Sequence, residues 1–499
     1  EKNTRYFLSL EKSRSKKKTI SRIRKNNGEV ICNQMDVLQE LVRFYSTLYN
    51  QTTETENVTQ ATNEFMENEN FTKLSEDEAM LCEGLINEEE AIKALKQMKN
   101  GSSPGSDGLN TEFIQFFWDK LKTFLINSFN ETFTNEEMSY TQKQGIIILL
   151  HKGKELARDN LNNWRPITLT NIDYKILAKR MSKVVNKLIN LDQVGYLKGR
   201  SISSIIRSID DVIDYLINTN DSGYLLALDY CKAFDSISRE FLLHALDVFG
   251  FGQQFKKWIN ILYKNTFSSI NHGGWISQTF PVTCGIRQGC PFSPLAFILA
   301  VELLAIKIRN SDISGIKLPA KMPVVRQLKI KQLADDTTLF LKNKEDMISA
   351  SKILQDFTKF SGLALNQSKT KVMKLGIGHM DDNLPFETTE KIKILGIYFQ
   401  NDVRAQNIAD NWNERLDKIV NLIKVWSHRD LSIRGKIVII KSLLLSQLTF
   451  VMQPIGLPGH ILTKINRILY TFIWQRKFTN RKAFEKVKRI VMEGNFNSG

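Results

Sequence analysis

The sequence predicts an α+β body followed by a helical C-terminal region, and three observations support that fold class. Between residues 224 and 399, short β-type apolar runs alternate with segments of helical period. After about Gln400, apolar residues recur at helical spacing over 407–426, 433–448 and 462–474. The chain has 499 residues, too many for one simple core, so several subdomains are expected. Mixed strands and helices with a helical tail are typical of a catalytic body with a helical appendage.

The first hundred residues contain two predicted helices separated by a polar segment. Apolar residues at helical spacing predict the first helix over 35–49: Leu38, Leu41, Val42, Tyr45 and Leu48. The run 51–70 is rich in Thr, Asn and Glu, which predicts a loop or linker. Three acids after Asn87 open the second helix, which extends to Met98, because the helix dipole favours negative charge in the first turn. Residues 1–98 either bind RNA or brace the domain that follows, and the sequence leaves both open.

The middle of the chain supplies turn, strand and helix signals. A cluster of Gly, Ser and Pro at 101–108 predicts a turn before an aromatic-rich helix, whose rings are expected in the core. The further elements predicted are strands over 146–150, 224–228 and 337–341, and helices over 174–189 and 201–217.

Three aspartates adjoin two of these strands. Strand 224–228 ends directly before Asp229, and the pair Asp335-Asp336 directly precedes strand 337–341. Two adjacent acids in a turn repel each other unless divalent cations neutralise them. Carboxylates converging from separate strands are what two-metal phosphoryl chemistry requires, since two cations can activate a hydroxyl and stabilise the leaving oxygen. The alternative is a solvated Asp-Asp turn and an unrelated acid at the end of a strand.

The net charge of +16 favours a polyanionic partner. Basic residues crowd both ends of the chain, over 12–25 and 464–489, whereas 54–90 is strongly acidic. Basic blocks of this kind suit a surface that follows a nucleic-acid backbone and binds in a salt-dependent way. Solvated basic helices on an ordinary protein are the alternative.

Five cysteines, an odd number without CxxC spacing, favour reduced thiols in an intracellular protein and argue against a structural zinc site. No stretch approaches the apolar length of a membrane span, so no membrane partner is expected. The chain opens at Glu1 without a secretory segment, which suggests an excerpt from a longer protein.

Eight short motifs follow one another in a fixed order over about three hundred residues. They are SPGSDG (103–108), NWRPI (163–167), DQVGY (192–196), ALDYCKAFD (227–235), GIRQGCPFSP (285–294), LADD (333–336), GLALNQSK (362–369) and ILG (394–396). Together they resemble the ordered reverse-transcriptase blocks of LINE-type non-LTR retrotransposons. The opening RYFLSLE (5–11) and the stretch from Trp426 to Lys436 also look LINE-like, so the resemblance covers nearly the whole chain.

The resemblance implies a right-hand polymerase with fingers, palm and thumb, an N-terminal extension and a helical C-terminal region. The boundaries expected on this basis are 1–100 for the extension, 101–222 for the fingers, 223–400 for the palm with further fingers/palm elements, and 401–499 for the thumb and the start of a following basic helical region. The implied activity is RNA-directed DNA synthesis from a DNA 3′ end, as in target-primed reverse transcription.

In the family pattern, Asp229, Asp335 and Asp336 match the catalytic acids that bind two Mg²⁺, for which Mn²⁺ is a possible substitute. The backbone carbonyl of Tyr230 would be a further metal ligand. Lys369 matches a lysine that protonates the leaving pyrophosphate. This chain departs from the commoner pattern at Leu333, where an aromatic residue usually precedes Ala-Asp-Asp. An apolar side chain can still pack there, so the change is expected to be conservative.

Several residues match positions that contact the incoming dNTP. Phe234 matches the steric gate that excludes a ribose 2′-OH, and Arg165 matches a fingers residue whose forked guanidinium holds the triphosphate. Gln288 flanks the nucleotide pocket, and Gly289 allows close backbone approach. Lys152 is either a second phosphate contact or a solvated lysine. The neighbouring Arg287 is assigned either to the template or to structure.

Leu395 and Gly396 resemble the primer-grip turn. The partners implied are an RNA template, a DNA primer or target, dNTPs and the element's own RNA, in the nucleus and cytoplasm. The upstream endonuclease and downstream Cys-rich segment of longer family proteins are not visible in this sequence. Two alternatives remain: a catalytically silent nucleic-acid-binding module, and a maturase or telomerase-like relative. The first is disfavoured because all three aspartates are present.

Overall fold

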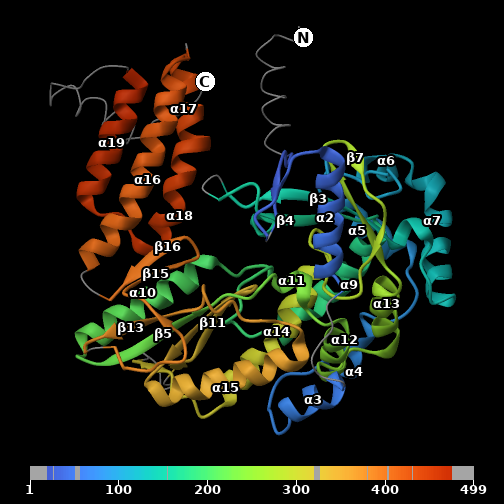
Figure 1. The fold of residues 1–499 in the computed structure, drawn as a ribbon, viewed down its shortest axis with the longest axis horizontal. Helices are drawn as coiled ribbons and strands as arrows, with labels where there is room; N and C mark the ends of the chain where they lie inside the picture. The colour runs from blue at the N-terminus through green and yellow to red at the C-terminus, as the bar shows by residue number, and fades with distance from the viewer. Residues whose placement is uncertain are drawn as a thin grey trace. The chain divides into compact units, whose positions relative to one another are not determined.

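The computed structural model describes residues 19–25, 27–50, 57–153, 156–319, 326–378, 380–401, 404–429 and 431–474. These residues form two compact units (Figure 1). The first combines residues up to Arg200 with Leu228–Gly315 and Leu328–Thr370, and the second combines Ser201–Ala227, Ile316–Gln327 and the residues from Lys371 onward. The motif at 5–11 and most of both basic ends lie outside the described residues.

The first unit contains a sheet in the order β4-β3-β6-β7, with β8 also paired to β6. Strands β3 (Gln144–His151) and β4 (Trp164–Leu169) are antiparallel, with Leu150 opposite Arg165. Strand β6 (Phe267–His272) runs parallel to β3. The short strands β7 (Trp275–Ile276) and β8 (Phe280–Pro281) are antiparallel to β6. The predicted strand 146–150 is thus confirmed as the centre of β3.

Helix α2 (Gln34–Leu48) covers one face of this sheet (Figure 1). It starts at Asn33, whose side chain accepts a hydrogen bond from the Met35 amide, a cap that typically contributes about 1 kcal/mol. Its apolar stripe shares one hydrophobic core with Ile147, Trp164 and Ile270 of the sheet. The helix predicted over 35–49 is confirmed, and it braces the sheet that follows it.

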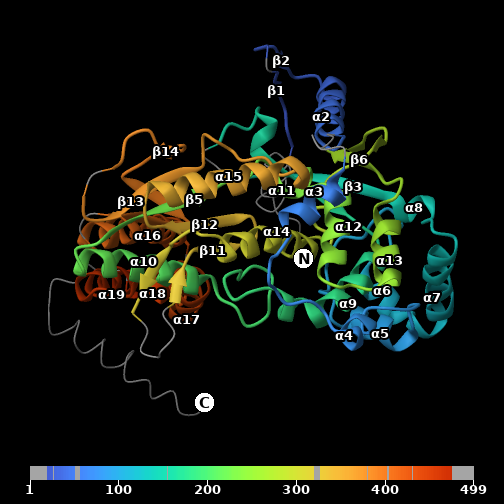
Figure 2. The same ribbon diagram turned by 90° about the horizontal axis from the view of Figure 1, so that it is seen from below.

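Helix α14 (Ser293–Asn310) is buried on nearly all sides in the first unit. Helices α9 (Asp173–Leu188), α12 (Arg239–Val248) and α15 (Lys344–Ser361) pack around it, and α13 (Gln253–Tyr263) lies beside α12 (Figure 2). Further elements of this unit are β1 (Ile23–Arg24), β2 (Val30–Ile31), α4 (Glu76–Met80), α5 (Glu88–Lys96), α6 (Thr111–Phe116), α7 (Trp118–Thr134), α8 (Tyr140–Lys143), η1 (Leu161–Asn163) and α11 (Ala233–Ser236).

One sequence prediction is wrong here, because the polar run 51–70 contains helix α3 (Val58–Phe65). Asn57 caps the helix through the Gln60 amide, and Val58, Thr62 and Phe65 are buried at helical spacing. The helix packs on α12 and α15, so tertiary contacts support it where its polar composition suggested a linker.

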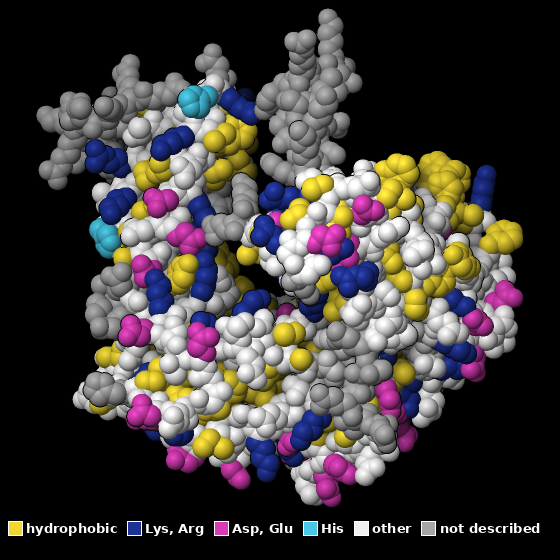
Figure 3. Space-filling view, viewed as in Figure 1, with side chains coloured by type: hydrophobic (Ala, Val, Ile, Leu, Met, Phe, Trp, Pro, Cys, Tyr) yellow, Lys and Arg dark blue, Asp and Glu magenta, His cyan; other side chains and the backbone are white. Residues whose placement is uncertain are grey.

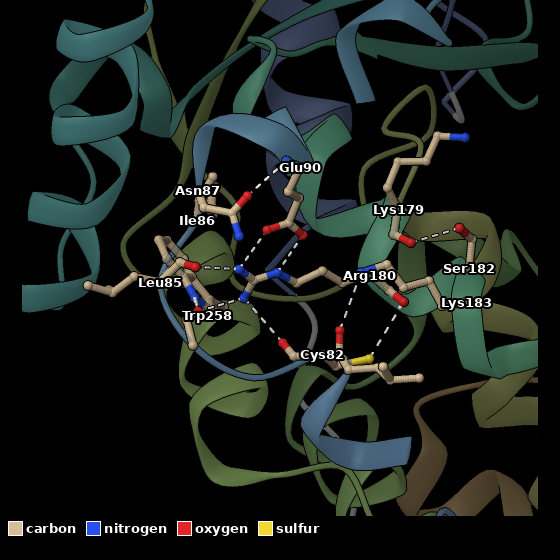
Figure 4. A network of polar contacts seen from close by, with 12 residues as sticks. Cys82, Leu85, Ile86, Asn87, Glu90, Lys179, Arg180, Ser182, Lys183 and Trp258 are labelled. Atoms are coloured by element: carbon tan, nitrogen blue, oxygen red, sulfur yellow. Dashed lines mark hydrogen bonds and ion pairs between the residues drawn. The ribbon is translucent and has the colours of Figure 1, made fainter. Parts of the chain in front are cut away.

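Arg180, on α9, joins that helix to the segment between α4 and α5 (Figure 4). Its guanidinium makes a two-pronged pair with Glu90, at 2.7 and 2.8 Å, and donates to the carbonyls of Cys82, Gly84 and Leu85. The side chain is almost fully buried, so these partners satisfy a charge that would otherwise be costly to bury. Arg180 is therefore a structural anchor.

In the second unit, β5 (Ser222–Leu228) pairs antiparallel with β13 (Lys371–Gly376), and β13 pairs parallel with β14 (Glu387–Thr388). Helix α10 (Ile202–Asn218) packs on β13 through an apolar face. Strands β15 (Lys391–Ile394) and β16 (Ile397–Gln400) form a hairpin. The rest of the unit comprises β9 (Ile316–Leu318), β10 (Arg326–Leu328), α16 (Arg404–Ser427), α17 (Ile433–Ile439), η2 (Ile440–Leu444), α18 (Leu445–Ile455) and α19 (Gly459–Trp474). Helices α16 to α19 confirm the predicted helical C-terminal region.

One described helix, Ile433–Ile455, is long and apolar enough to cross a membrane by length and composition alone. The expectation that no stretch approaches such a length is therefore wrong. Within the second unit, α18 packs on α10 and α16. Val438, in α17, is exposed. Figure 3 shows hydrophobic and Lys or Arg side chains interspersed over this helical region.

Candidate active site

The paired aspartates lie at the tip of a tight hairpin in the first unit. Strands β11 (Ile330–Leu333) and β12 (Asp336–Leu341) are antiparallel, and Leu333 lies opposite Asp336, so Ala334 and Asp335 form the two-residue turn. Leu341 and most of β12 are buried, which fixes the strand while its first residue, Asp336, stays at the surface. The strand predicted over 337–341 is confirmed.

The third aspartate, Asp229, directly follows β5 and belongs to the first unit. Its backbone is held by the loop that ends in the GLALNQSK motif. The Asn366 amide donates to the Asp229 carbonyl at 2.7 Å, and the Asp229 amide donates to Thr370 Oγ1 at 3.3 Å. Tyr230 and Leu365 form an isolated antiparallel bridge beside it. This motif therefore sets where the Asp229 carboxylate points.

The three carboxylates act on one another electrostatically. Desolvation of the carboxylate, together with the negative charges of Asp335 and Asp229, raises the pKa of Asp336 to about 6. Burial also raises the pKa of Asp335, with a smaller contribution from Asp229, while Arg165 opposes the shift. These effects indicate that the three predicted acids lie near enough in the first unit to influence one another.

The donor set suits a hard divalent cation. Carboxylate and carbonyl oxygens are the ligands that Mg²⁺ prefers, and closely spaced carboxylates with raised pKa values gain most from a cation between them. Among the residues that the structure describes, no group of three or more His, Cys, Asp or Glu is already arranged to hold a metal ion. Like charges repel, so convergence of these carboxylates on one point requires a cation. The chemistry of Asp229, Asp335, Asp336 and the Tyr230 carbonyl fits Mg²⁺.

Three basic side chains share the space of the acids. Lys369 Nζ lies 3.6 Å from Asp229 Oδ2, an ion pair that solvent screens because both side chains are substantially exposed. Burial lowers the pKa of Lys152, and the charges of Lys369 and Arg165 lower it further. The pairing of β3 with β4 explains this grouping, because Lys152 follows β3 and donates its amide to the Asn163 carbonyl just before β4. The site therefore combines a negative and a positive group of side chains.

Helix α11 carries the predicted steric gate. It starts after Lys232, whose φ of 48° turns the chain sharply out of the Asp229 segment. Phe234 is half-buried and stacks on Phe297 of α14, with ring centroids 4.5 Å apart. Its carbonyl accepts the Ile286 amide at 2.7 Å. One face of the ring is thus fixed by the core, which is compatible with a gate at the other.

The next residue, Asp235, is a buried carboxylate at the centre of a network. It accepts hydrogen bonds from Tyr49 Oη, at 2.9 Å, and from Gln288 Nε2, at 2.9 Å. Burial raises the pKa of Asp235 to about 6, against the opposing effects of Tyr49, Lys232 and Gln288. Tyr49 ends α2, so the N-terminal extension reaches the predicted nucleotide pocket. The sequence analysis assigned no role to Asp235 or Tyr49. The only available signal for Asp235 was its place in the ALDYCKAFD motif, and Tyr49 had no such signal.

Gln288 and Gly289 lie against β4. The Thr168 amide donates to the Gln288 carbonyl at 2.6 Å. Gly289 has a φ of 101°, and a Cβ there would lie 2.7 Å from the Thr168 carbonyl oxygen, so only glycine fits this approach. Arg287 is buried and donates to the backbone carbonyls of Lys143 and Phe267, which supports the structural alternative for this residue.

The predicted primer-grip residues lie in the second unit. Leu395 and Gly396 form the two-residue turn of the β15–β16 hairpin, with φ values of 50° and 81°. Positive φ at both positions is the pattern of a type I′ turn, which favours glycine. Arg415 of α16 donates to the Gly396 carbonyl at 3.4 Å.

Comparison with known proteins finds one matching family. Residues 150–399, half of the chain, match the family described as reverse transcriptase (RNA-dependent DNA polymerase). The matched range contains every predicted site residue, from Lys152 to Gly396.

Relatives of the chain include proteins of transposable elements. The transposon TX1 uncharacterized 149 kDa protein of Xenopus laevis is 27% identical over 486 residues, which cover 95% of this chain and 36% of that protein. The retrovirus-related Pol polyprotein from the type-2 retrotransposable element R2DM of Drosophila melanogaster is 28% identical, over 43% of this chain and 20% of its own length. A corresponding Pol polyprotein from the type-1 retrotransposable element R2 of Popillia japonica is 26% identical, over 57% of this chain and 39% of its own length. This chain thus spans between a fifth and two fifths of these relatives.

Among solved structures, telomerase from Candida albicans in complex with a fragment of telomeric RNA aligns with a TM-score of 0.38. The sequence identity is 10%, and the alignment covers 76% of this chain and 66% of that chain.

Proposed function

Because the chain belongs to the reverse transcriptase (RNA-dependent DNA polymerase) family, we propose that it extends a DNA 3′ end on an RNA template for a LINE-type retrotransposon. The observation that carries this proposal is the group of three electrostatically coupled aspartates, Asp229, Asp335 and Asp336, faced by three basic side chains. The names of the TX1 and R2 relatives support the assignment to a non-LTR element.

The right-hand architecture is part of the proposal. The β4-β3-β6 sheet with its helices would be the fingers, the aspartate hairpin with α14 and α15 would belong to the palm, and α16–α19 would be the thumb. The family match over residues 150–399 supports a polymerase fold with mixed helices and sheets. The division at residues 100, 222 and 400 stays a prediction.

Chemistry at the acids would be nucleotidyl transfer. Two Mg²⁺, or Mn²⁺ as a substitute, would when bound activate the primer hydroxyl and neutralise charge on the triphosphate. Asp229, Asp335, Asp336 and the Tyr230 carbonyl would hold them. The primer oxygen attacks the α-phosphorus, a new P–O bond forms, and the bond to pyrophosphate breaks. Lys369, close to Asp229, would donate a proton to the departing pyrophosphate.

The surrounding side chains would select and hold the dNTP. Arg165 and Lys152 would bind the triphosphate, since Arg165 acts on Asp335 and Lys152 interacts with Asp229, so both present positive charge beside the predicted acids. Phe234 would exclude the ribose 2′-OH with the ring face that Phe297 does not cover. Gln288 and Gly289 would flank the base and sugar. Leu395 and Gly396 would grip the primer strand.

The expected partners are RNA template, DNA primer or target, dNTPs and the element's own RNA, acting in the nucleus and cytoplasm. The net charge of +16 supports the nucleic-acid partners through counterion release. Target nicking would come from sequence outside this chain or from another protein.

The test is extension of a DNA primer on an RNA template with Mg²⁺ and dNTPs, using Asp335→Ala as the control. Long products from the parent chain alone would support the polymerase and its carboxylate site together. Tight RNA binding without extension would favour the catalytically silent binding module instead.

A further inference from the structure

The turn that carries the paired aspartates requires an unusual backbone at Ala334. In this two-residue hairpin Ala334 has a φ of 56°, whereas Asp335 has a negative φ. That combination matches the φ pattern of a type II′ turn, whose first central position is dominated by glycine. A side chain at positive φ costs on the order of 1 kcal/mol or more, so neighbouring structure must hold it there.

A single side chain from a distant segment supplies that support. Gln193 is completely buried, and its Oε1 accepts from the Ala334 amide, at 2.8 Å, and from the Gly195 amide, at 2.8 Å. Its Nε2 donates to the Ala334 carbonyl at 3.2 Å. Both backbone polar groups of the strained residue are therefore satisfied by one amide.

The segment around Gln193 is itself fixed against β11. The Gln332 amide donates to the Asp192 carbonyl at 2.9 Å, and the Val194 amide donates to the Gln332 carbonyl at 2.9 Å. Asp192 also pairs with Lys331 at 2.8 Å. A Cβ at Gly195 would lie 2.6 Å from the Ala334 nitrogen, so glycine is required for this close approach. All these residues belong to the first unit.

We propose that Gln193 is a positioning residue for nucleotidyl transfer, which holds Ala334 at positive φ so that Asp335 and Asp336 project from the turn in register. The proposal rests on the function proposed above. The hydrogen bonds from the Gln193 side chain to the turn go to backbone groups, so it acts through Ala334 and takes no part in the chemistry itself. An amide suits this role because it both donates and accepts at one end.

The first experiment compares Gln193→Met with the parent chain and with Gln332→Met. Methionine has a similar length and neither donates nor accepts strongly. Gln332 is an equally buried neighbour, but its side-chain amide donates to Thr337 Oγ1 instead of to the turn. We expect Gln193→Met to lower kcat by about 10–100-fold, with KM for dNTP and affinity for RNA within about twofold, because displacing reacting groups by about 1 Å can have effects of this size. Gln332→Met should leave kcat within about threefold even where both variants melt earlier.

The second experiment adds Ala334→Gly to Gln193→Met. Glycine adopts positive φ without a clamp, so we expect the double variant to regain much of the lost kcat. A general loss of stability would not be rescued in this way. Unchanged kcat in Gln193→Met, or a loss that Ala334→Gly does not relieve, would overturn the proposal. If Gln193→Met does not fold, Gln193→Asn, which keeps an amide one methylene shorter, is compared in the same way.

Amide hydrogen exchange provides a readout that does not depend on synthesis. The Ala334 and Gly195 amides should be protected in the parent chain and exchange faster in Gln193→Met. Equal exchange rates in both chains would overturn the proposal that Gln193 holds the Ala334 turn. A parent chain that protects these amides but never extends a primer would instead overturn the proposed function.

Discussion

Asp336 and Asp235 have the same raised pKa of about 6, yet their surroundings differ completely. Asp336 is exposed as a residue, but neighbouring groups partly desolvate its carboxylate, and the charges of Asp335 and Asp229 add to that effect. Asp235 is buried, and hydrogen bonds from Tyr49 and Gln288 together with the charge of Lys232 oppose the effect of burial. A raised pKa therefore marks either a carboxylate beside like charges or one whose charge the protein has already satisfied. Only the first kind matches the carboxylate site of the proposed function.

The largest expected effect is on synthesis by Asp336→Ala. Removing one carboxylate should lower the extension rate by about a thousandfold or more, since a metal site supplies several kcal/mol of transition-state stabilisation. RNA affinity should be nearly unchanged, and the melting temperature unchanged or higher, because one of three repelling charges is gone. Primer extension measures the rate, RNA titration measures the affinity, and thermal unfolding measures the melting temperature. Loss of folding would mean that Asp336 is a structural acid, and the comparison with Asp235 would fail.

Asp235→Ala should show the opposite pattern, with a large effect on stability. The variant leaves Tyr49 Oη and Gln288 Nε2 without their acceptor and removes a partner from Lys232, which together cost about 2–4 kcal/mol. Thermal and denaturant unfolding of the full chain measure the loss. A melting temperature equal to that of the parent would show that the network contributes nothing to folding.

The contrast also explains what could be predicted from the sequence. Local patterns predicted α2, β5 and β12, because α2 has a helical apolar period and the two strands are short β-type runs. The resemblance grouped Asp229, Asp335 and Asp336 as catalytic acids, an assignment that stays a prediction. Polar composition concealed α3, since three buried residues and a cap were enough to form it once α12 and α15 covered them.

The contacts that could not be predicted join residues far apart in the chain. Tyr49 and Asp235 are 186 positions apart, and Gln193 and Ala334 are 141 apart. No local period or motif spacing encodes such pairings, because they depend on how α2 and the DQVGY segment pack on distant elements. The sequence could assign α2 to a helix and the DQVGY segment to a motif, but not the partner of each side chain.

Phe234 lies directly before Asp235 and gives the third prediction. Phe234→Ala should admit ribonucleotides, raising their incorporation relative to dNTPs by about 10–100-fold, because the clash with the 2′-OH is removed. Competing rNTP and dNTP incorporation on one template measures the ratio. The control is Phe297→Leu, which alters the stacked partner but leaves the gate ring. Unchanged sugar discrimination in Phe234→Ala would remove the gate assignment and leave a core residue.

The pH dependence of stability separates the two carboxylates further. The pKa of Asp235 is raised by folding from its ordinary value near 4 to about 6, so the folded chain binds this proton more tightly than the unfolded chain does. Its contribution to stability is therefore complete below about pH 4 and is lost as the pH rises through about 6. The facing groups are Tyr45, Tyr49, Lys152, Lys232, Gln288 and Cys284.

We therefore expect the stability difference between the parent and Asp235→Asn to change by roughly 1–2 kcal/mol between pH 4.5 and 7. Asparagine does not titrate, so the parent should lose stability relative to the variant over this range. Melting curves of both chains at matched ionic strength measure the difference. A constant difference across the range would mean that Asp235 does not titrate there.

The smallest expected effect, from Tyr49→Phe, tests whether the N-terminal extension contributes to the nucleotide pocket. The variant removes one hydroxyl whose hydrogen bond to buried Asp235 contributes about 1 kcal/mol, while the ring stays in the core that α2 shares with the sheet. Asp235 then keeps Gln288 as a partner, so the chain should fold with a slightly lower melting temperature. A rise in KM for dNTP without a change in kcat would place the effect on nucleotide binding, through a Gln288 amide that is less firmly held. Tyr45→Phe is the matched control, because it removes a buried hydroxyl from the same helix that is not bonded to Asp235 in the structure. Equal KM values for the two variants would mean that α2 supports the sheet alone, and that the pocket is complete without it.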